Sequence, residues 1–146
     1  MVRSSAASSV SDPVALRRVL VVDDHDDARE LLRLVLERAG HETRLLGSPS
    51  EAVQVALSFL PDVALIDIQM PELDGYQLAK QLRLQPELKQ CRLIAISGHP
   101  GEKAIARSVA AGFESVWAKP ISAEDVLALV AGRSRLRSAA ALTSKT

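Results

Sequence analysis

The stretch VLVVDD (Val19–Asp24) sets four consecutive apolar residues directly before two carboxylates. Apolar runs without polar alternation are typical of strands that are buried on both faces of a parallel sheet. Ligands of such sheets bind outside the carboxyl ends of the strands, because the loops converge there and helix N-termini point at the crevice. The stretch therefore predicts a buried strand that ends in a polar site.

Four further apolar runs follow, and segments of helical periodicity separate them. Together the predicted strands are Val19–Val22, Thr43–Leu46, Val63–Ile66, Leu93–Ile96 and Ser115–Ala118. The predicted helices are Asp26–Ala39, a segment between Ser48 and Pro61, about Gly75–Leu84, Glu102–Ala111 and Ala123–Ala131. This alternation predicts an α/β fold of (βα)₅ order, a doubly wound five-stranded parallel sheet in a three-layer α/β/α arrangement.

The first predicted helix has an apolar stripe that we expect to pack on the sheet. Its members recur at helical spacing and are Ala28, Leu31, Leu32, Val35 and Ala39. Gly40 follows at the position of a C-cap glycine and predicts the end of the helix.

Length, charge and cysteine content limit the class of protein. The 146 residues, 47% of them hydrophobic, suffice for one core and not for two ordinary domains. Lys plus Arg and Asp plus Glu each total 18, so no net charge attracts nucleic acid or an anionic membrane. No apolar run reaches the roughly 18 residues of a membrane span, and we expect no membrane insertion. The single cysteine, Cys91, excludes an intrachain disulfide and fits the reducing cytoplasm.

The ends of the chain differ in composition from its middle. We predict a flexible leader over residues 1–16, one folded domain over 17–131 and a flexible basic tail over 132–146. Because the tail holds few arginines, we expect no direct nucleic-acid binding.

Polar residues stand at the carboxyl ends of four of the five predicted strands. They are Asp23 and Asp24 after the first strand, Asp67 after the third, Ser97 and Gly98 after the fourth, and Lys119 and Pro120 after the fifth. An aspartate after a strand is usually a helix cap or a turn former, and a single serine or lysine there says even less. Their joint occurrence is what indicates a site.

The residue types in this set indicate a metal and a phosphoryl group. Three converging carboxylates repel one another and call for a cation, and ligands that are all oxygen favour Mg²⁺. A lysine and a hydroxyl supply the positive charge and the hydrogen bond that a phosphoryl group needs. A carboxylate nucleophile, a metal and a lysine together describe phosphoryl transfer to aspartate.

These residues resemble the CheY-like receiver domains of response regulators in two-component signalling. The matching pieces are VLVVDD at Val19–Asp24, LIDIQMPELDG at Leu65–Gly75, LIAISG at Leu93–Gly98 and VWAKPI at Val116–Ile121. The resemblance covers about Arg18 to Val130. It implies a flavodoxin-like, CheY-like fold and makes residues 17–131 a receiver domain.

The resemblance implies a role for each matching acidic position. Asp67 would accept the phosphoryl group. Asp23 and Asp24 would bind Mg²⁺ directly or through water, and Asp67 and the backbone carbonyl of Gln69 would complete the protein ligands.

The same resemblance assigns the remaining positions. Ser97 would bond to a phosphoryl oxygen and shift inward, Lys119 would pair with another oxygen, and a cis peptide bond would precede Pro120. Family members often carry Tyr or Phe three residues before the lysine, whereas this chain has Val116 there and Trp117 beside it. Trp117 is expected to pack between a helix and the sheet. Activation by a swinging aromatic side chain is thereby put in doubt.

The implied function is a phosphorylation-controlled switch or relay intermediate in the cytoplasm. A sensor histidine kinase or a histidine phosphotransfer protein would donate the group to Asp67, and contacts with a downstream protein effector would change. No metabolite would be turned over, so the chain is not expected to be an ordinary enzyme. The segments DGYQLAKQLR and AGFESVWAKPIS are similar to receivers of hybrid sensor kinases.

Three alternatives stay open at the level of sequence. A pseudo-receiver would bind proteins without phosphorylation, although the acidic, hydroxyl and lysine positions are complete. A phosphatase of the haloacid dehalogenase type needs a second Asp two residues after the nucleophile, where this chain has Gln69. A dinucleotide-binding enzyme needs a glycine-rich loop after the first strand, where this chain has Asp23 and Asp24.

Two histidines flank the predicted site. His25 and His99 are expected to face solvent, with His99 able to affect hydrolysis of the acyl phosphate.

Overall fold

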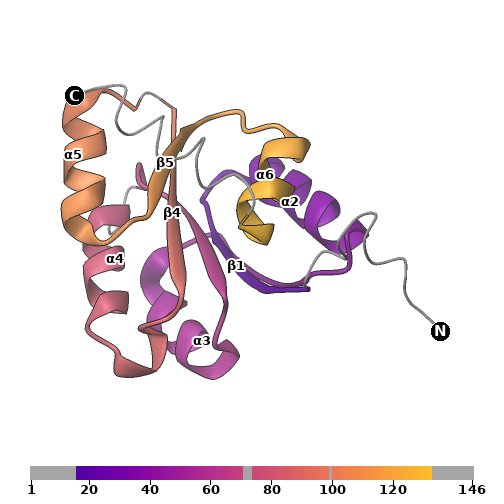
Figure 1. Cartoon of the computed structure of the whole chain (residues 1–146), viewed down its shortest axis with the longest axis horizontal. Coiled ribbons are helices and arrows are strands. Elements are labelled where there is room, and N and C mark those ends of the chain that lie inside the picture. Colours follow the sequence, from indigo (N-terminus) through magenta and orange to yellow (C-terminus); the bar gives the residue numbers. More distant parts are fainter. Residues whose placement is uncertain (1–15, 71–73, 99, 133–146) are drawn as a thin grey trace.

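A single parallel sheet forms the centre of the molecule. The computed structural model describes residues 16–70, 74–98 and 100–132. Its strands are β1 (Arg18–Val22), β2 (Glu42–Leu46), β3 (Val63–Asp67), β4 (Arg92–Ser97) and β5 (Ser115–Ala118). They lie in the order β2-β1-β3-β4-β5, and every neighbouring pair is parallel (Figure 1).

The connections between strands are helical. The α-helices are α2 (Asp26–Arg38), α3 (Ala52–Phe59), α4 (Gly75–Arg83), α5 (Glu102–Ala111) and α6 (Ala123–Ala131). Short 3₁₀ turns, η1 (Pro49–Glu51) and η2 (Pro86–Leu88), precede α3 and β4. The predicted five-stranded α/β fold is confirmed. Its helix boundaries agree within a residue or two, except that the segment after Ser48 begins as a 3₁₀ turn.

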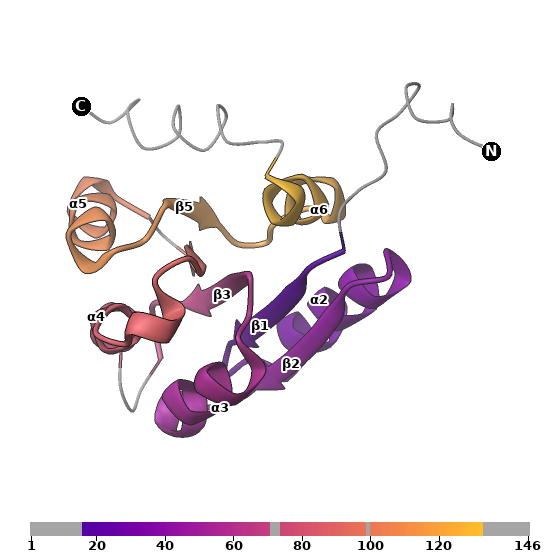
Figure 2. The ribbon, with the colours of Figure 1, turned by 60° about the horizontal axis from the view of Figure 1, so that its bottom comes forward.

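Two layers of helices cover the two faces of the sheet, as Figure 2 shows. Side chains alternate along a strand, so Leu20 and Val22 of β1 belong to the apolar cluster under α3, α4 and α5. Val19 and Val21 belong to the opposite cluster under α2 and α6. Because both faces are buried, the three central strands β1, β3 and β4 read as largely continuous apolar runs, whereas the edge strand β2 is partly exposed and more polar.

The predicted stripe on α2 is only partly correct. Leu32 and Leu36 are the buried residues of this helix, whereas Leu31 is 54% exposed and Ala39 is exposed as well. The helix carries so many apolar residues that two overlapping stripes fit its period, and the sheet selects the one through Leu36. Gly40 has a φ of 95°, as expected of a glycine that ends a helix.

The order of the strands fixes where a ligand can bind. The chain passes from β1 outward to β2 and then returns to β3 on the other side of β1, so the connections diverge between β1 and β3. A crevice opens at the carboxyl ends of two such strands. Val22 pairs with Ile66, so the next residues lie side by side: Asp23, just beyond β1, and Asp67, the last residue of β3.

Other predictions about the chain are tested less directly. Within the described parts of the chain, none of the helices is long and apolar enough to cross a membrane. The leader over residues 1–16 and the tail over 132–146 lie almost wholly outside the described residues. Their boundaries stay a prediction.

A buried histidine lies at the opposite end of the sheet from this crevice. His41 precedes β2 and is 4% exposed. Its Nδ1 accepts a hydrogen bond from the backbone N–H of Arg17 at 2.9 Å, so the neutral ring carries its proton on Nε2. That Nε2 is buried and has no hydrogen-bond partner among the described residues. Burial, with a smaller contribution from the nearby Arg17 charge, lowers the pKa of His41.

His41 predicts a loss of stability in mild acid. A lowered pKa in the folded state means that the unfolded chain binds the proton more readily, so the stability supplied by neutral His41 falls as the pH drops below about 6.5. We expect the free energy of unfolding in urea to decrease less between pH 8 and pH 5.5 in His41→Gln than in the wild type. At pH 8, where His41 is neutral in both the folded and the unfolded chain, the difference between the two proteins gives the part of the stability loss that does not depend on protonation. Equal decreases in both proteins would contradict this account.

Candidate functional site

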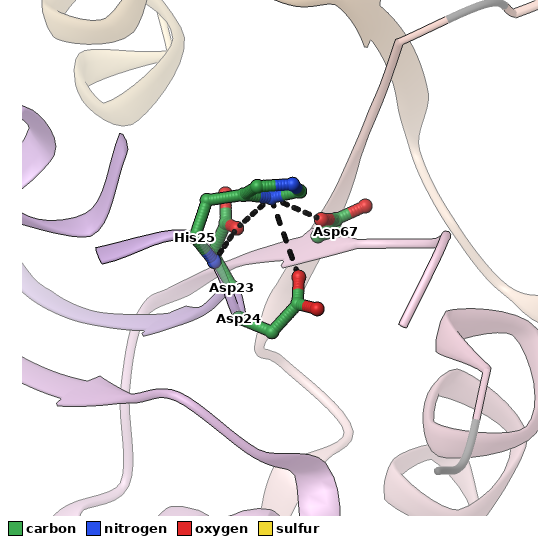
Figure 3. Close-up of side chains that lie close together, drawn as sticks. All are labelled: Asp23, Asp24, His25 and Asp67. Carbon is green, nitrogen blue, oxygen red and sulfur yellow. Dashed lines mark hydrogen bonds and ion pairs between the residues drawn. The ribbon is translucent and has the colours of Figure 1, made fainter. Parts of the chain in front are cut away.

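Three carboxylates meet at the carboxyl ends of β1 and β3. Asp23 and Asp67 are each 2% exposed, and Asp24 is partly exposed beside them. Ligand atoms of these three residues and of His25 all lie within 4.8 Å of one another (Figure 3). The sequence prediction that Asp23, Asp24 and Asp67 converge is confirmed.

Lys119 supplies the positive charge next to the two buried carboxylates. Its Nζ lies 3.0 Å from Asp23 Oδ2 and 3.1 Å from Asp67 Oδ2. Partial burial disfavours the ammonium form, but the hydrogen bonds to Asp23 and Asp67 outweigh this effect and raise the pKa of Lys119. The lysine therefore stays charged and links β5 to β1 and β3.

His25 turns its ring toward the carboxylates, although sequence reasoning favoured a solvent-facing residue. Its Nδ1 lies 3.1 Å from Asp23 Oδ1, 3.3 Å from Asp24 Oδ1 and 3.5 Å from Asp67 Oδ2, as the dashed lines in Figure 3 mark. Nδ1 is also 3.1 Å from Lys119 Nζ. The side chain is 63% exposed, so the prediction is correct for exposure and wrong for direction. His99 lies outside the described residues.

Asp23 accepts hydrogen bonds through both its side-chain carboxylate and its backbone carbonyl. The His25 backbone N–H donates to Asp23 Oδ1 at 2.9 Å, which is a local turn bond. Arg29 Nη1, on the first turn of α2, donates to the Asp23 carbonyl at 2.8 Å. Sequence reasoning missed Arg29, and its only signal is its place one helical turn after His25.

The side chain of Gln69 connects the loop after Asp67 to the loop after Ser97 by a hydrogen bond. The Gln69 backbone N–H donates to Asp67 Oδ1 at 2.8 Å, which fixes the carboxylate. The Gln69 side-chain Oε1 accepts from the backbone N–H of Gly98 at 3.2 Å. Gln69 and Gly98 therefore tie the loop after β3 to the loop after β4. The predicted role of the Gln69 carbonyl toward a metal is not tested by these contacts.

The other predicted positions lie at the same edge of the sheet. Ser97 is 1% exposed, and its backbone carbonyl accepts a hydrogen bond from the Lys119 backbone N–H at 2.8 Å. The Lys119–Pro120 bond is cis, as expected. The structure thus brings Ser97 and Lys119 to adjacent strand ends, beside Asp67.

Val116 and Trp117 point to opposite faces of the sheet. Val116 is buried in the cluster under α3, α4 and α5. Trp117 packs against the cluster under α2 and α6, and its Nε1 donates to Ser115 Oγ at 3.1 Å. The expected packing of Trp117 between helix and sheet is confirmed. It lies on the face away from α5.

The donor set fits a divalent cation. Three carboxylates converge and one lysine contacts two of them, so negative charge is in excess in a largely buried place. Asp24 Oδ1 is itself buried and accepts no hydrogen bond from any residue that the structure describes. A buried acceptor of this kind costs free energy unless a cation or a water pairs with it. Clustered carboxylate oxygens are the ligands that Mg²⁺ takes in proteins.

Helix α4 begins in direct contact with the backbone that follows Asp67. A Cβ on Gly75 would meet Ile68 Cα at 2.6 Å and the Asp67 carbonyl oxygen at 2.9 Å, so only glycine permits this approach. The next residue, Tyr76, is buried, and its hydroxyl donates to the Ala104 carbonyl in α5 at 3.4 Å. The guanidinium of Arg107, also in α5, lies 4.0 Å from the centre of the Tyr76 ring.

Comparisons with known proteins agree on one family. The model of the response regulator receiver domain matches residues 19–131. The polar-differentiation response regulator DivK of Brucella ovis is 33% identical over 73% of this chain and 86% of its own.

Solved structures give the same result. The chemotaxis protein CheY4 of Vibrio cholerae matches with a TM-score of 0.75 and 26% identity over 80% of this chain and 97% of its own. A receiver domain of a signal transduction histidine kinase from Syntrophus aciditrophicus matches with a TM-score of 0.71 and 29% identity, over 78% of this chain and 86% of its own.

A methyl group at position 75 tests the contact behind Asp67. Alanine normally stabilises a helix more than glycine does. In Gly75→Ala, however, the clash with Ile68 must be relieved by a backbone shift. We expect a loss of about 1 to 3 kcal/mol in the free energy of unfolding, measured by urea denaturation. Gly101→Ala is the control without a clash, because a Cβ added there would meet nothing within 4 Å, and we expect a loss below about 1 kcal/mol, which comes from its position as the N-cap of α5. Equal effects of the two substitutions would contradict the steric account.

Proposed function

Because the chain belongs to the response regulator receiver family, we propose that Asp67 accepts a phosphoryl group from a phosphohistidine and thereby switches protein contacts. One observation carries this proposal. The buried Asp67 carboxylate has one oxygen held by the Gln69 N–H at 2.8 Å, and the other lies 3.1 Å from the Lys119 ammonium. A carboxylate held in this way is positioned as a nucleophile.

The proposed transfer is a displacement at phosphorus. An oxygen of Asp67 forms the new O–P bond, the P–N bond of the donor breaks, and the imidazole leaves with the electron pair and takes up a proton. Lys119 then pairs with a phosphoryl oxygen, and the Ser97 hydroxyl donates to another. Mg²⁺ held by Asp23, Asp24, Asp67 and the Gln69 carbonyl would neutralise charge on the transferred group.

The contacts of Gln69 disfavour a phosphatase of the haloacid dehalogenase type. Such an enzyme needs a carboxyl group two residues after the nucleophile to move a proton. Gln69 is an amide there, and its Oε1 accepts from the Gly98 N–H. An amide neither donates nor takes up a proton near neutral pH. A receiver that stores the phosphoryl group agrees better with this arrangement.

A pseudo-receiver agrees less well with the same site. It would have no need of three clustered carboxylates, which repel one another in the absence of a cation. The contacts of Lys119 with Asp23 and Asp67, and the place of Asp24 in the same carboxylate cluster, support phosphorylation over simple binding.

An apolar surface beside the site supports a protein as phosphoryl donor. A pocket of about 220 Å³ opens between α2 and the loop after β5, and its walls include Ala28, Leu31, Pro120 and Ile121. Leu31, which the sheet does not bury, stands at its rim. We propose that a helix of a sensor kinase or histidine phosphotransfer protein packs here. The cytoplasmic location and the downstream effector stay predictions.

Phosphorylation can be tested with small-molecule donors. We expect acetyl phosphate with Mg²⁺ to give the wild type an acid-labile phosphoryl adduct, detected by intact mass, and Asp67→Asn to give none. Beryllofluoride with Mg²⁺ should change the emission of Trp117, the only tryptophan, in the wild type alone. An equal adduct on Asp67→Asn, or no adduct on the wild type with any donor, would contradict the proposal.

The docking surface can be separated from the chemistry. The donor is a phosphorylated histidine phosphotransfer protein that transfers its phosphoryl group to the wild type. Leu31→Asp should slow this transfer by about tenfold, because a charge replaces an apolar contact. Its rate with acetyl phosphate should not change. Leu84→Asp is the matched control, since Leu84 is 77% exposed at the end of α4, away from this pocket. A loss with both donors, or the same loss in the control, would count against docking at Leu31.

A further inference from the structure

His25 lies closer to the carboxylates than its role as a helix N-cap requires. It precedes α2 with extended backbone angles and makes no side-chain cap bond. Its backbone N–H is used by Asp23 Oδ1, and this bond anchors the residue at the mouth of the site. The ring is therefore free to bond outside its own helix, and it points at the carboxylates (Figure 3).

The distances around Nδ1 are those of atoms that share one coordination shell. Two protein atoms that each lie about 2.0 to 2.1 Å from the same ion are about 2.9 to 3.4 Å apart at octahedral or tetrahedral angles. His25 Nδ1 lies 3.1 Å from Asp23 Oδ1, 3.3 Å from Asp24 Oδ1 and 3.5 Å from Asp67 Oδ2. The nitrogen is thus spaced from the Asp23 and Asp24 oxygens as a fellow ligand would be, and it lies just beyond this range from the Asp67 oxygen.

Two further features favour a metal bond at this nitrogen. Asp24 Oδ1, the atom 3.3 Å away, is buried and without a hydrogen-bond partner among the described residues, so the ring does not satisfy it. The His25 side chain is also 63% exposed. In a neutral ring that carries its proton on Nε2, Nδ1 has a lone pair, which faces the Lys119 ammonium at 3.1 Å in the structure and would turn to an ion bound between the carboxylates.

From this geometry we infer that His25 Nδ1 is a fourth side-chain ligand of the metal site and shifts its preference toward borderline first-row ions such as Co²⁺ and Ni²⁺. Carboxylates and water suit Mg²⁺, whereas imidazole binds the later transition metals more strongly. The inference rests on the proposed function, because the same three carboxylates hold the ion.

Calorimetric titration with single metals tests the preference. His25→Ala should weaken binding of Co²⁺ and Ni²⁺ by about ten- to hundredfold and that of Mg²⁺ by less than about threefold. Asp67→Asn is the matched comparison, and it should weaken all three ions because it removes a shared ligand. Parallel losses of Co²⁺ and Mg²⁺ in His25→Ala would overturn the inference.

A spectroscopic measurement tests the bond itself. Pulsed electron paramagnetic resonance of the Mn²⁺-loaded wild type should detect one directly coordinated imidazole nitrogen. The signal should disappear in His25→Ala and persist in His41→Gln, whose histidine lies at the other end of the sheet. Thermal unfolding of His25→Ala, an exposed position, confirms that the variant is folded.

The outcomes separate this inference from the proposed function. Mg²⁺ binding that depends on Asp67, without a nitrogen signal from Mn²⁺, would overturn the role of His25 and leave the receiver function standing. Failure of the wild type to bind both Mg²⁺ and Mn²⁺ would overturn the metal site and the proposed function together.

Discussion

The charge balance at one edge of the sheet governs the rest of the molecule. The register of β1 against β3 sets Asp23 and Asp67 side by side in a place that water scarcely reaches. Such a pair is unfavourable on its own, because like charges in a low dielectric repel strongly. Lys119 offsets this repulsion by touching both carboxylates, and it does so from a third strand. The sheet and the site are therefore parts of one arrangement.

Much of the fold could be predicted from the sequence because each local signal agrees with the parallel sheet. Val19–Val22 is continuously apolar, since helices cover both faces of β1. Glycines after α2 and α5 have the positive φ that ends a helix. The convergence of Asp23, Asp67 and Lys119 follows from the topology, which brings all carboxyl ends to one edge.

The errors arose where the sequence leaves a direction undetermined. On α2, Leu31, Leu32 and Leu36 are equally apolar, and only packing against the sheet decides that Leu31 faces outward. At His25, the spacing of residues places the ring near the site but says nothing of its torsion angles. The contact of its Nδ1 with three carboxylates depends on the side-chain conformation that His25 adopts just before α2.

The close approach of Gly75 to Ile68 bears on how the two halves of this face move. Gly75 has no side chain of its own, so a displacement of the backbone at Ile68 would press directly on the first turn of α4. Tyr76 continues this line of contacts to α5 through the Ala104 carbonyl and the Arg107 guanidinium. The contacts that connect the backbone after Asp67 to α5 thus need no aromatic side chain at position 116.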